Sequence, residues 1–178
     1  MTGSIDLSGF SKQGKLDYLY GLPFETQGVQ FGHLLAGKLG GTFEARFKDH
    51  NFRDGLLHLP DGREVTIDVK ACRTAKDFPF ELYRGDGKTK SSAFMLDLAL
   101  FHLEAEGRWF LVNVGKWRKV TDNFKTVESS HPLRVVRDKV TGEPSAHVKW
   151  FSPAELARRG CSQDVTKWVQ EAQQLNRS

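Results

Sequence analysis

The sequence contains little cysteine and no long apolar segment. Only two cysteines occur among its 178 residues, Cys72 and Cys161. Neither lies in a CxxC pair or at a His-Cys spacing, so the sequence offers no zinc motif and no disulfide framework. No apolar run approaches the roughly 20 residues of a membrane-spanning helix, and Met1 to Phe10 lacks the basic start and apolar stretch of a secretion signal. We therefore expect a soluble cytoplasmic protein with no membrane partner.

Internal repeats, low-complexity tracts and a clear interdomain linker are also absent from the sequence. At 178 residues the chain is long enough to bury a core, and its hydrophobic and charged fractions, 39% and 27%, are ordinary for a globular protein. These properties predict a single α/β domain over residues 1–178, with a basic C-terminal portion, residues 113–178, packed on the core.

A β-hairpin is predicted from Arg53 to Lys70. The Pro60-Asp61-Gly62 stretch suits a three-residue turn, because proline fixes φ at the first corner and glycine supplies the positive φ of a G1 bulge. Counting outward from this turn places Asp54 directly opposite Asp68. A two-residue turn would shift the pairing by one residue and mix polar with apolar side chains.

Alternation along the two strands sorts the hairpin into two faces. The apolar face collects Leu57, Leu59, Val65, Ile67 and Val69. The other face collects Asp54, Leu56, His58, Glu64, Thr66, Asp68 and Lys70. The first face is expected to join the core, and the second carries the groups capable of chemistry.

Two carboxylates directly across a strand pair repel each other, and a bound cation reverses that repulsion. Oxygen ligands from Asp54 and Asp68 suit Mg²⁺, with Mn²⁺ as a substitute, and the carbonyl of Val69 could add a ligand. Lys70 lies two residues beyond Asp68 and so on the same side of the strand. Its ammonium could orient or activate an attacking water and neutralise charge on a phosphorane.

Asp54 is followed by an apolar strand, a turn and then Asp68-Val69-Lys70. This order of features resembles the motif of the PD-(D/E)xK nuclease superfamily, which includes restriction-endonuclease-like enzymes and Holliday-junction resolvases. Arg53 stands where that motif has proline. The resemblance implies a restriction-endonuclease-like core, a mixed central β-sheet flanked by helices. It also implies that Asp54 and Asp68 bind the metal while Lys70 assists the nucleophile.

The triplet Asp86-Gly87-Lys88 matches the same D-x-K pattern and provides an internal comparison. It lies in a glycine-containing stretch without an apolar strand, so we interpret it as a loop. The strand, the upstream Asp54 and the sorted faces distinguish Asp68-Val69-Lys70 from it. The alternative for the latter triplet is a solvated hairpin face with an Asp-Lys pair.

The resemblance also implies a third acid from a preceding helix or strand. Glu44 and Glu25 are candidates, although a solvent-facing glutamate is the alternative for each. Gln30 or His33 on the helix could serve instead. His58 shares the polar hairpin face, and Asp49-His50-Asn51 lacks the partners of an HNH site. Cys72 is interpreted as a packed thiol rather than a nucleophile.

Apolar spacing predicts the remaining elements. We expect a helix over 28–40, a strand over 42–47, an irregular loop over 76–90, a buried helix or alternatively a strand over 93–103, a buried central strand over 109–114, a hairpin over 133–151, a helix over 152–160 with a capping-box pattern and N1 proline, and an amphipathic helix over 162–175.

Charge is distributed unevenly along the sequence. Through Lys70 the chain has eight Lys and Arg against nine Asp and Glu, whereas residues 113–160 contain ten against five. Cations interleaved with aromatic residues suit a surface that follows phosphates, although a solvated basic face is the alternative. The predicted nucleic-acid contacts are Lys116, Trp117, Arg118, Lys119 and Lys125.

Together these features predict a magnesium-dependent nuclease that hydrolyses phosphodiester bonds of DNA rather than RNA, an endonuclease of restriction, phage or repair type acting as a homodimer. The alternative is a non-catalytic nucleic-acid-binding or interaction protein that retains a nuclease-like fold.

Overall fold

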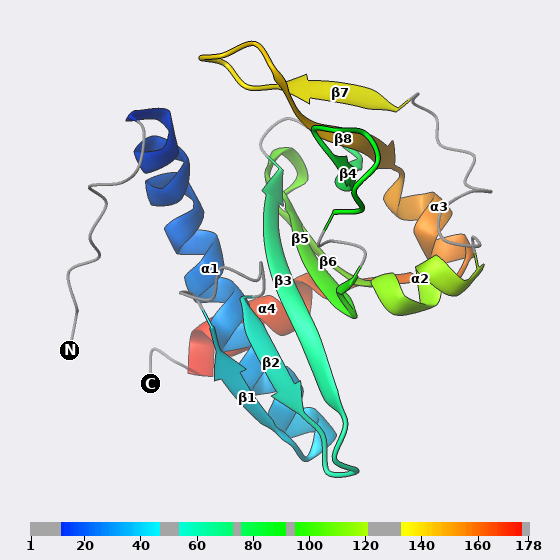
Figure 1. Cartoon of the computed structure of the whole chain (residues 1–178). Coiled ribbons are helices and arrows are strands. Elements are labelled where there is room, and N and C mark those ends of the chain that lie inside the picture. The colour runs from blue at the N-terminus through cyan, green and yellow to red at the C-terminus, as the bar shows by residue number, and fades with distance from the viewer. Residues whose placement is uncertain (1–11, 47–53, 73–75, 92–94, 121–132, 176–178) are drawn as a thin grey trace.

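The computed structural model describes residues 12–46, 54–72, 76–91, 95–120 and 133–175, with side chains from residue 23 onward (Figure 1). Four helices lie in these ranges: α1 (Lys12–Leu39), α2 (Val114–Val120), α3 (Pro153–Arg158) and α4 (Thr166–Leu175). The strands are β1 (Thr42–Ala45), β2 (Gly55–His58), β3 (Glu64–Cys72), β4 (Phe78–Arg84), β5 (Leu98–Leu103), β6 (Arg108–Asn113), β7 (Arg134–Arg137), β8 (Pro144–Phe151) and β9 (Ser162–Asp164).

A six-stranded sheet in the order β1-β2-β3-β5-β6-β9 forms the centre of the fold. Strands β3 and β5 run parallel and the other neighbours antiparallel, so the sheet is mixed. Helices α1 and α4 pack on one face through a cluster that includes Phe31, Ile67, Leu100 and Val169. A second sheet, ordered β4-β8-β7, covers the other face together with α2 and α3. The predicted class, α/β with a mixed central sheet flanked by helices, is confirmed.

The β2–β3 hairpin has the predicted register. Leu57 pairs with Val65 and His58 with Glu64, and Gly62 has a φ of 81° in the turn. Leu57 and Ile67 are each 1% exposed in the core beneath α1, as their place on the apolar face predicts. The opposite face is also covered, since Leu56 and Thr66 are buried.

Helix α1 starts at Lys12, earlier than the predicted start at Gly28, and contains Pro23. It ends where predicted: Gly40 has a φ of 70° and the N–H of Gly41 donates to the Ala36 carbonyl at 2.9 Å. Glycine at position 28 lets α1 approach the sheet closely, because a Cβ there would lie 2.2 Å from Cγ2 of Val69.

Two predictions for the middle of the chain are wrong. The expected loop over 76–90 contains β4, which pairs with β8 and buries Phe78 and Phe80. The expected buried helix over 93–103 is replaced by β5, the strand alternative. Strand β5 reads as a continuous apolar run because both of its faces are covered, which removes the polar positions that normally reveal a strand.

The last third of the chain follows the predictions with two differences. The strand over 109–114 is β6 and the hairpin over 133–151 is β7–β8, while α3 begins at Pro153 as expected. The Ser152 side chain makes no cap hydrogen bond, and Glu155 instead pairs with Arg158 and Arg159. Residues 162–164 form β9 before the final helix begins.

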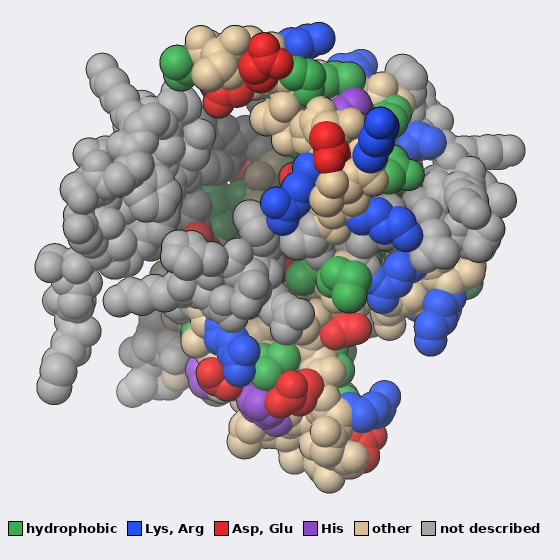
Figure 2. Space-filling view, in the orientation of Figure 1, with side chains coloured by type: hydrophobic (Ala, Val, Ile, Leu, Met, Phe, Trp, Pro, Cys, Tyr) green, Lys and Arg blue, Asp and Glu red, His purple; other side chains and the backbone are tan. Residues whose placement is uncertain are grey.

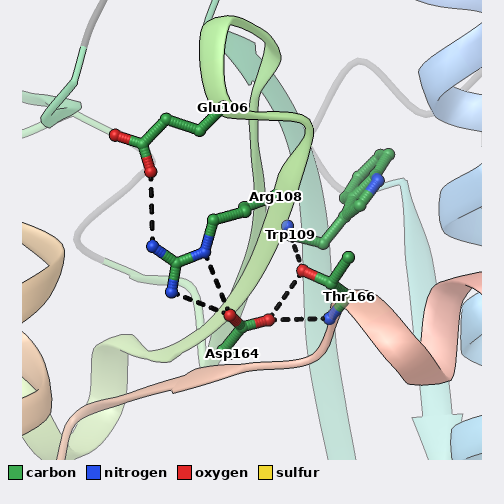
Figure 3. A network of polar contacts seen from close by, with 5 residues as sticks. All are labelled: Glu106, Arg108, Trp109, Asp164 and Thr166. Atoms are coloured by element: carbon green, nitrogen blue, oxygen red, sulfur yellow. Dashed lines mark hydrogen bonds and ion pairs between the residues drawn. The ribbon is translucent and has the colours of Figure 1, made fainter.

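A polar network explains why α4 begins at Thr166 (Figure 3). Asp164 Oδ1 accepts hydrogen bonds from the N–H and hydroxyl of Thr166, at 2.9 and 2.6 Å. The Thr166 hydroxyl accepts from the Trp109 N–H at 2.9 Å, and Arg108 pairs with Asp164 Oδ2 at 2.8 Å. These contacts fix the start of α4 against β6. No helix in the described part of the chain is long and apolar enough to cross a membrane.

The close contact between α1 and β3 generates a prediction for two glycines of the same helix. Gly28→Ala should lower the free energy of unfolding by about 1 to 3 kcal/mol, because the added methyl meets the stiff β-branched side chain of Val69. Gly37→Ala is the matched control, since a Cβ there meets nothing within 4 Å. It should stabilise by up to about 1 kcal/mol through helix propensity. Urea unfolding measures both, and equal effects would contradict the packing described.

Candidate metal centre

The candidate site lies along an edge of β3 that β2 leaves open. Strand β2 begins at Gly55, opposite Ile67, so its pairing with β3 stops there. Strand β5 pairs with β3 on the other side as far as Cys72. Among the described residues, the stretch from Asp68 to Cys72 therefore has a strand neighbour on one side, and Asp54 lies on its other side.

Asp54 occupies this open edge with its backbone and its side chain. Its N–H donates to the Ile67 carbonyl at 3.1 Å, and its Oδ2 accepts from the N–H of Val69 at 2.5 Å. The carboxylate thus takes the place of the missing strand. Because the N–H and C=O of one residue point to the same side of a strand, the Val69 carbonyl is directed toward the same edge.

Asp68 and Lys70 project from β3 on the face predicted to carry the chemistry. Asp68 is 6% exposed, and its Oδ2 lies 2.5 Å from Nζ of Lys70. Among the described residues this buried oxygen has no hydrogen-bond partner beyond that ion pair. The structure therefore brings the three predicted residues to the same stretch of β3, with Asp54 at its edge and Asp68 and Lys70 on one face.

The electrostatics of the site are those of crowded carboxylates. Burial raises the pKa of Asp54 from 3.8 to about 7, and the charge of Asp68 adds to this effect. Burial lowers the pKa of Lys70, but Asp68, Asp54 and Glu81 of β4 together outweigh it and raise the pKa above its ordinary value. Lys70 is therefore a cation near neutral pH, surrounded by acids.

Glu25 on α1 also belongs to this electrostatic group. Burial, followed by the charge of Asp68, raises the pKa of Glu25, and Glu25 in turn raises the pKa of Asp54. Its position follows from the helix: Glu25 precedes Gly28 by three residues, so the two share a helix face, and Gly28 packs on Val69. The helical spacing singles out Glu25 only once the contact between Gly28 and Val69 is known from the structure.

The additional residues suggested by the sequence have other neighbours. Glu44 and His58 contact each other at 3.4 Å in a solvent-exposed group, where Glu44 also pairs with Arg46. Gln30 lines a groove between α1 and α4. The structure shows no contact between Glu44, Gln30 or His58 and Asp54, Asp68 or Lys70 among the described residues, so their assignment to the site stays a prediction.

Trp117 cannot stack on a nucleic-acid base. It is 1% exposed and packs edge-on against Phe80 and Phe151, so its predicted contact role is wrong. Lys116 is exposed, with Nζ beside Gly160. Arg118 and Lys119 also lie on α2, whereas Lys125 and Asp49-His50-Asn51 fall outside the described residues.

Two further expectations are confirmed. Asp86-Gly87-Lys88 lies in a turn in which Gly87 has a φ of 66°, and Asp86 accepts hydrogen bonds from the N–H groups of Lys88 and Thr89. Cys72 is buried, and burial raises the pKa of its thiol to about 12, which leaves it protonated and unreactive.

The donor set fits a cation that keeps much of its water. No three His, Cys, Asp or Glu side chains converge as a metal cluster within the described ranges. Asp54 and Asp68 instead provide a pair of carboxylates, with the Val69 carbonyl directed to the same edge. Magnesium typically takes one or two protein carboxylates and completes its octahedron with water and substrate oxygens.

Comparisons with known proteins identify no family. No protein-family model matches the sequence, and no curated protein matches it significantly. Among solved structures, the chain is similar to a bacterial homing endonuclease, I-Ssp6803I, at 16% sequence identity and a TM-score of 0.33. The match covers 75% of this chain and 82% of the other. A TM-score of this size does not establish a shared fold.

The raised pKa of Asp54 generates a stability prediction for the metal-free protein. Between about pH 4 and pH 7 the folded state retains a proton that the unfolded state has lost, so this carboxyl makes stability fall as the pH rises through that window. Asp54→Asn removes the effect and keeps an oxygen that can accept from Val69. At about pH 8 in EDTA the variant should be more stable than wild type by about 1 to 3 kcal/mol.

Urea unfolding at about pH 5 and about pH 8 measures this difference, because other titrating groups cancel between the two proteins. The advantage of the variant should be larger at the higher pH. An advantage that is absent or independent of pH would show that Asp54 ionises normally.

Proposed function

We propose that this protein is a divalent-metal-dependent nuclease with a PD-(D/E)xK arrangement on a restriction-endonuclease-like core, hydrolysing phosphodiester bonds of DNA. The single observation that carries the proposal is the placement of the half-buried Asp54 and the buried Asp68 at one edge of β3 beside Lys70. Packing alone gives no reason to gather buried like charges, because they oppose folding. A cation and a phosphate group supply the missing compensation.

Asp54 and Asp68, with the carbonyl of Val69, would hold Mg²⁺, and Mn²⁺ would substitute for it. When bound, the cation polarises a phosphate oxygen and lowers the pKa of a coordinated water. Glu25 would accept a hydrogen bond from water in the same shell, because the charge of Asp68 raises the pKa of Glu25 and the charge of Glu25 raises the pKa of Asp54.

Lys70 would act as a fixed positive charge. The surrounding carboxylates raise its pKa, so it does not take the proton from the nucleophile at neutral pH. Its ammonium instead orients the attacking water by hydrogen bonding and stabilises negative charge that develops on the phosphorane. The ion pair with Asp68 holds Nζ at the face where the phosphate would lie.

DNA cleavage tests the assignment of Lys70. Purified protein with MgCl₂ or MnCl₂ should cut labelled DNA, and Lys70→Ala should reduce the rate by about 100-fold or more, because a charge aimed at the transition state is lost. Lys88→Ala is the matched control, since Lys88 ends the second D-x-K triplet in an exposed turn. It should leave the rate unchanged.

Linear, branched and single-stranded substrates should all be tried. If wild type and Lys70→Ala behave alike and neither cleaves, the protein is a binding module rather than a nuclease.

Metal binding can be measured without catalysis. A ligand at about 100 times its Kd stabilises the folded state by about 2.7 kcal/mol, so MnCl₂ should raise the Tm of the wild-type protein. Asp68→Asn should abolish most of that rise, because it removes one of two carboxylate ligands. Glu44→Gln, which changes an exposed acid paired with Arg46 and His58, should retain it. Equal shifts in all three proteins would place the metal elsewhere.

A further inference from the structure

We propose that the β7–β8 hairpin is an arm that binds duplex DNA, with its cations on the phosphates and Val140 at its tip inserted into a groove. The proposal rests on the proposed function, because that function makes DNA the substrate. It concerns residues far from the candidate metal centre in the sequence.

Exposed apolar side chains are concentrated in this hairpin. Of the eight large hydrophobic residues exposed among the described residues, Leu133, Val135, Val136 and Val140 lie here. Val140 is 86% exposed, more than any of the others. Contiguous exposed apolar residues of this kind mark surfaces that bind a partner.

Strand β7 is also an edge strand. Within the described ranges it pairs with β8 alone, and all four of its residues are exposed. Figure 1 shows the hairpin extending across the top of the molecule, above α1 and the central sheet. An uncovered edge bearing valines favours association with another molecule.

The charge of the hairpin selects the kind of partner. Arg134, Arg137 and Lys139 are all exposed on it, and Figure 2 shows Lys and Arg side chains at the top of this face, beside Asp and Glu side chains. Residues 133–151 hold four Lys and Arg against two acids, Asp138 and Glu143, which are also exposed. The Asp138 side chain accepts hydrogen bonds from the N–H groups of Val140 and Thr141, each at 2.8 Å. An arm of this charge attracts a polyanion and repels the same arm of a second copy.

The tip is held rigidly by its own hydrogen bonds. The N–H of Asp138 donates to the Glu143 carbonyl, and the N–H of Gly142 donates to the Asp138 carbonyl, both at 2.9 Å. Arg137 Nη1 donates to the Gly142 carbonyl at 3.0 Å. A preorganised tip loses little conformational entropy when it binds, so the exposed valine is presented at low cost.

The arm is also placed to reach a duplex held at the candidate metal centre. The charge of Glu81 on β4 acts on Lys70, so β4 lies beside the site. Strand β7 is two strand spacings from β4 in the sheet order, about 10 Å away. The major groove is about 12 Å wide and admits a two-stranded ribbon such as this hairpin.

Fluorescence anisotropy tests the proposal with a random-sequence duplex of about three helical turns. All proteins carry Lys70→Ala, which prevents cleavage in MgCl₂. The arm variant Lys139→Gln/Val140→Ser changes two exposed residues, so folding is not expected to suffer. The matched control Lys167→Gln/Leu175→Ser removes one exposed cation and one exposed apolar side chain from α4. Thermal unfolding verifies that both variants are folded.

The arm variant should bind the duplex about 10-fold more weakly than the control. A plot of log Kd against log salt concentration should have a slope smaller by about 1 for the arm variant than for the protein with Lys139 in place. Val140→Ser alone should weaken binding with the slope unchanged, because it removes no charge. Equal affinity of arm variant and control would overturn the proposal. Light scattering could also overturn the proposal. If the control is a dimer and the arm variant is a monomer, the arm binds a second copy of the chain rather than DNA.

Failure of the proposed function can be told apart from failure of this inference. If the protein without the Lys70→Ala change cuts no DNA but the arm variant still weakens duplex binding, the arm stands and the nuclease assignment does not. If it cuts DNA and arm variant and control bind alike, the nuclease assignment stands and the arm does not.

Discussion

Repulsion between Asp54 and Asp68 is the interaction on which the candidate site depends. Burial and mutual charge raise the pKa of Asp54 to about 7, so the metal-free site stores an unfavourable interaction that the rest of the fold sustains. Buried apolar side chains on both faces of the central sheet supply the stability that offsets this interaction. Leu57 and Ile67 lie beneath α1, and Leu56 lies on the other face of the sheet. Ionisable groups with strongly shifted pKa values are typical of functional sites.

Three features of the backbone bring the charges together. Strand β2 begins one residue after Asp54, which leaves the β3 edge beyond Ile67 open to a carboxylate. The parallel β5 fixes the other edge of β3. Glycine at position 28 lets α1 approach β3, which carries Glu25 toward the same edge. The candidate site therefore lies where an antiparallel hairpin meets a parallel pair.

The hairpin was predictable because local rules determine it: the Pro60-Asp61-Gly62 turn sets the register, and the register sets both faces. Strand β5 was not predictable from the sequence. Because both of its faces are buried, it lacks the alternation of polar and apolar residues that identifies a strand. Trp117 was misassigned because composition cannot tell a stacking aromatic from a core one. Glu25 depends on the packing of α1 on Val69, a tertiary contact that sequence pattern does not contain.

The most direct test is the position of a bound cation. Crystals soaked in MnCl₂ should give one anomalous peak within about 2.0 to 2.3 Å of a carboxylate oxygen from both Asp54 and Asp68. The Val69 carbonyl should lie in the same coordination shell. A peak at another set of residues, or no peak here at a Mn²⁺ concentration that stabilises the protein, would contradict a shared ion at the open edge of β3.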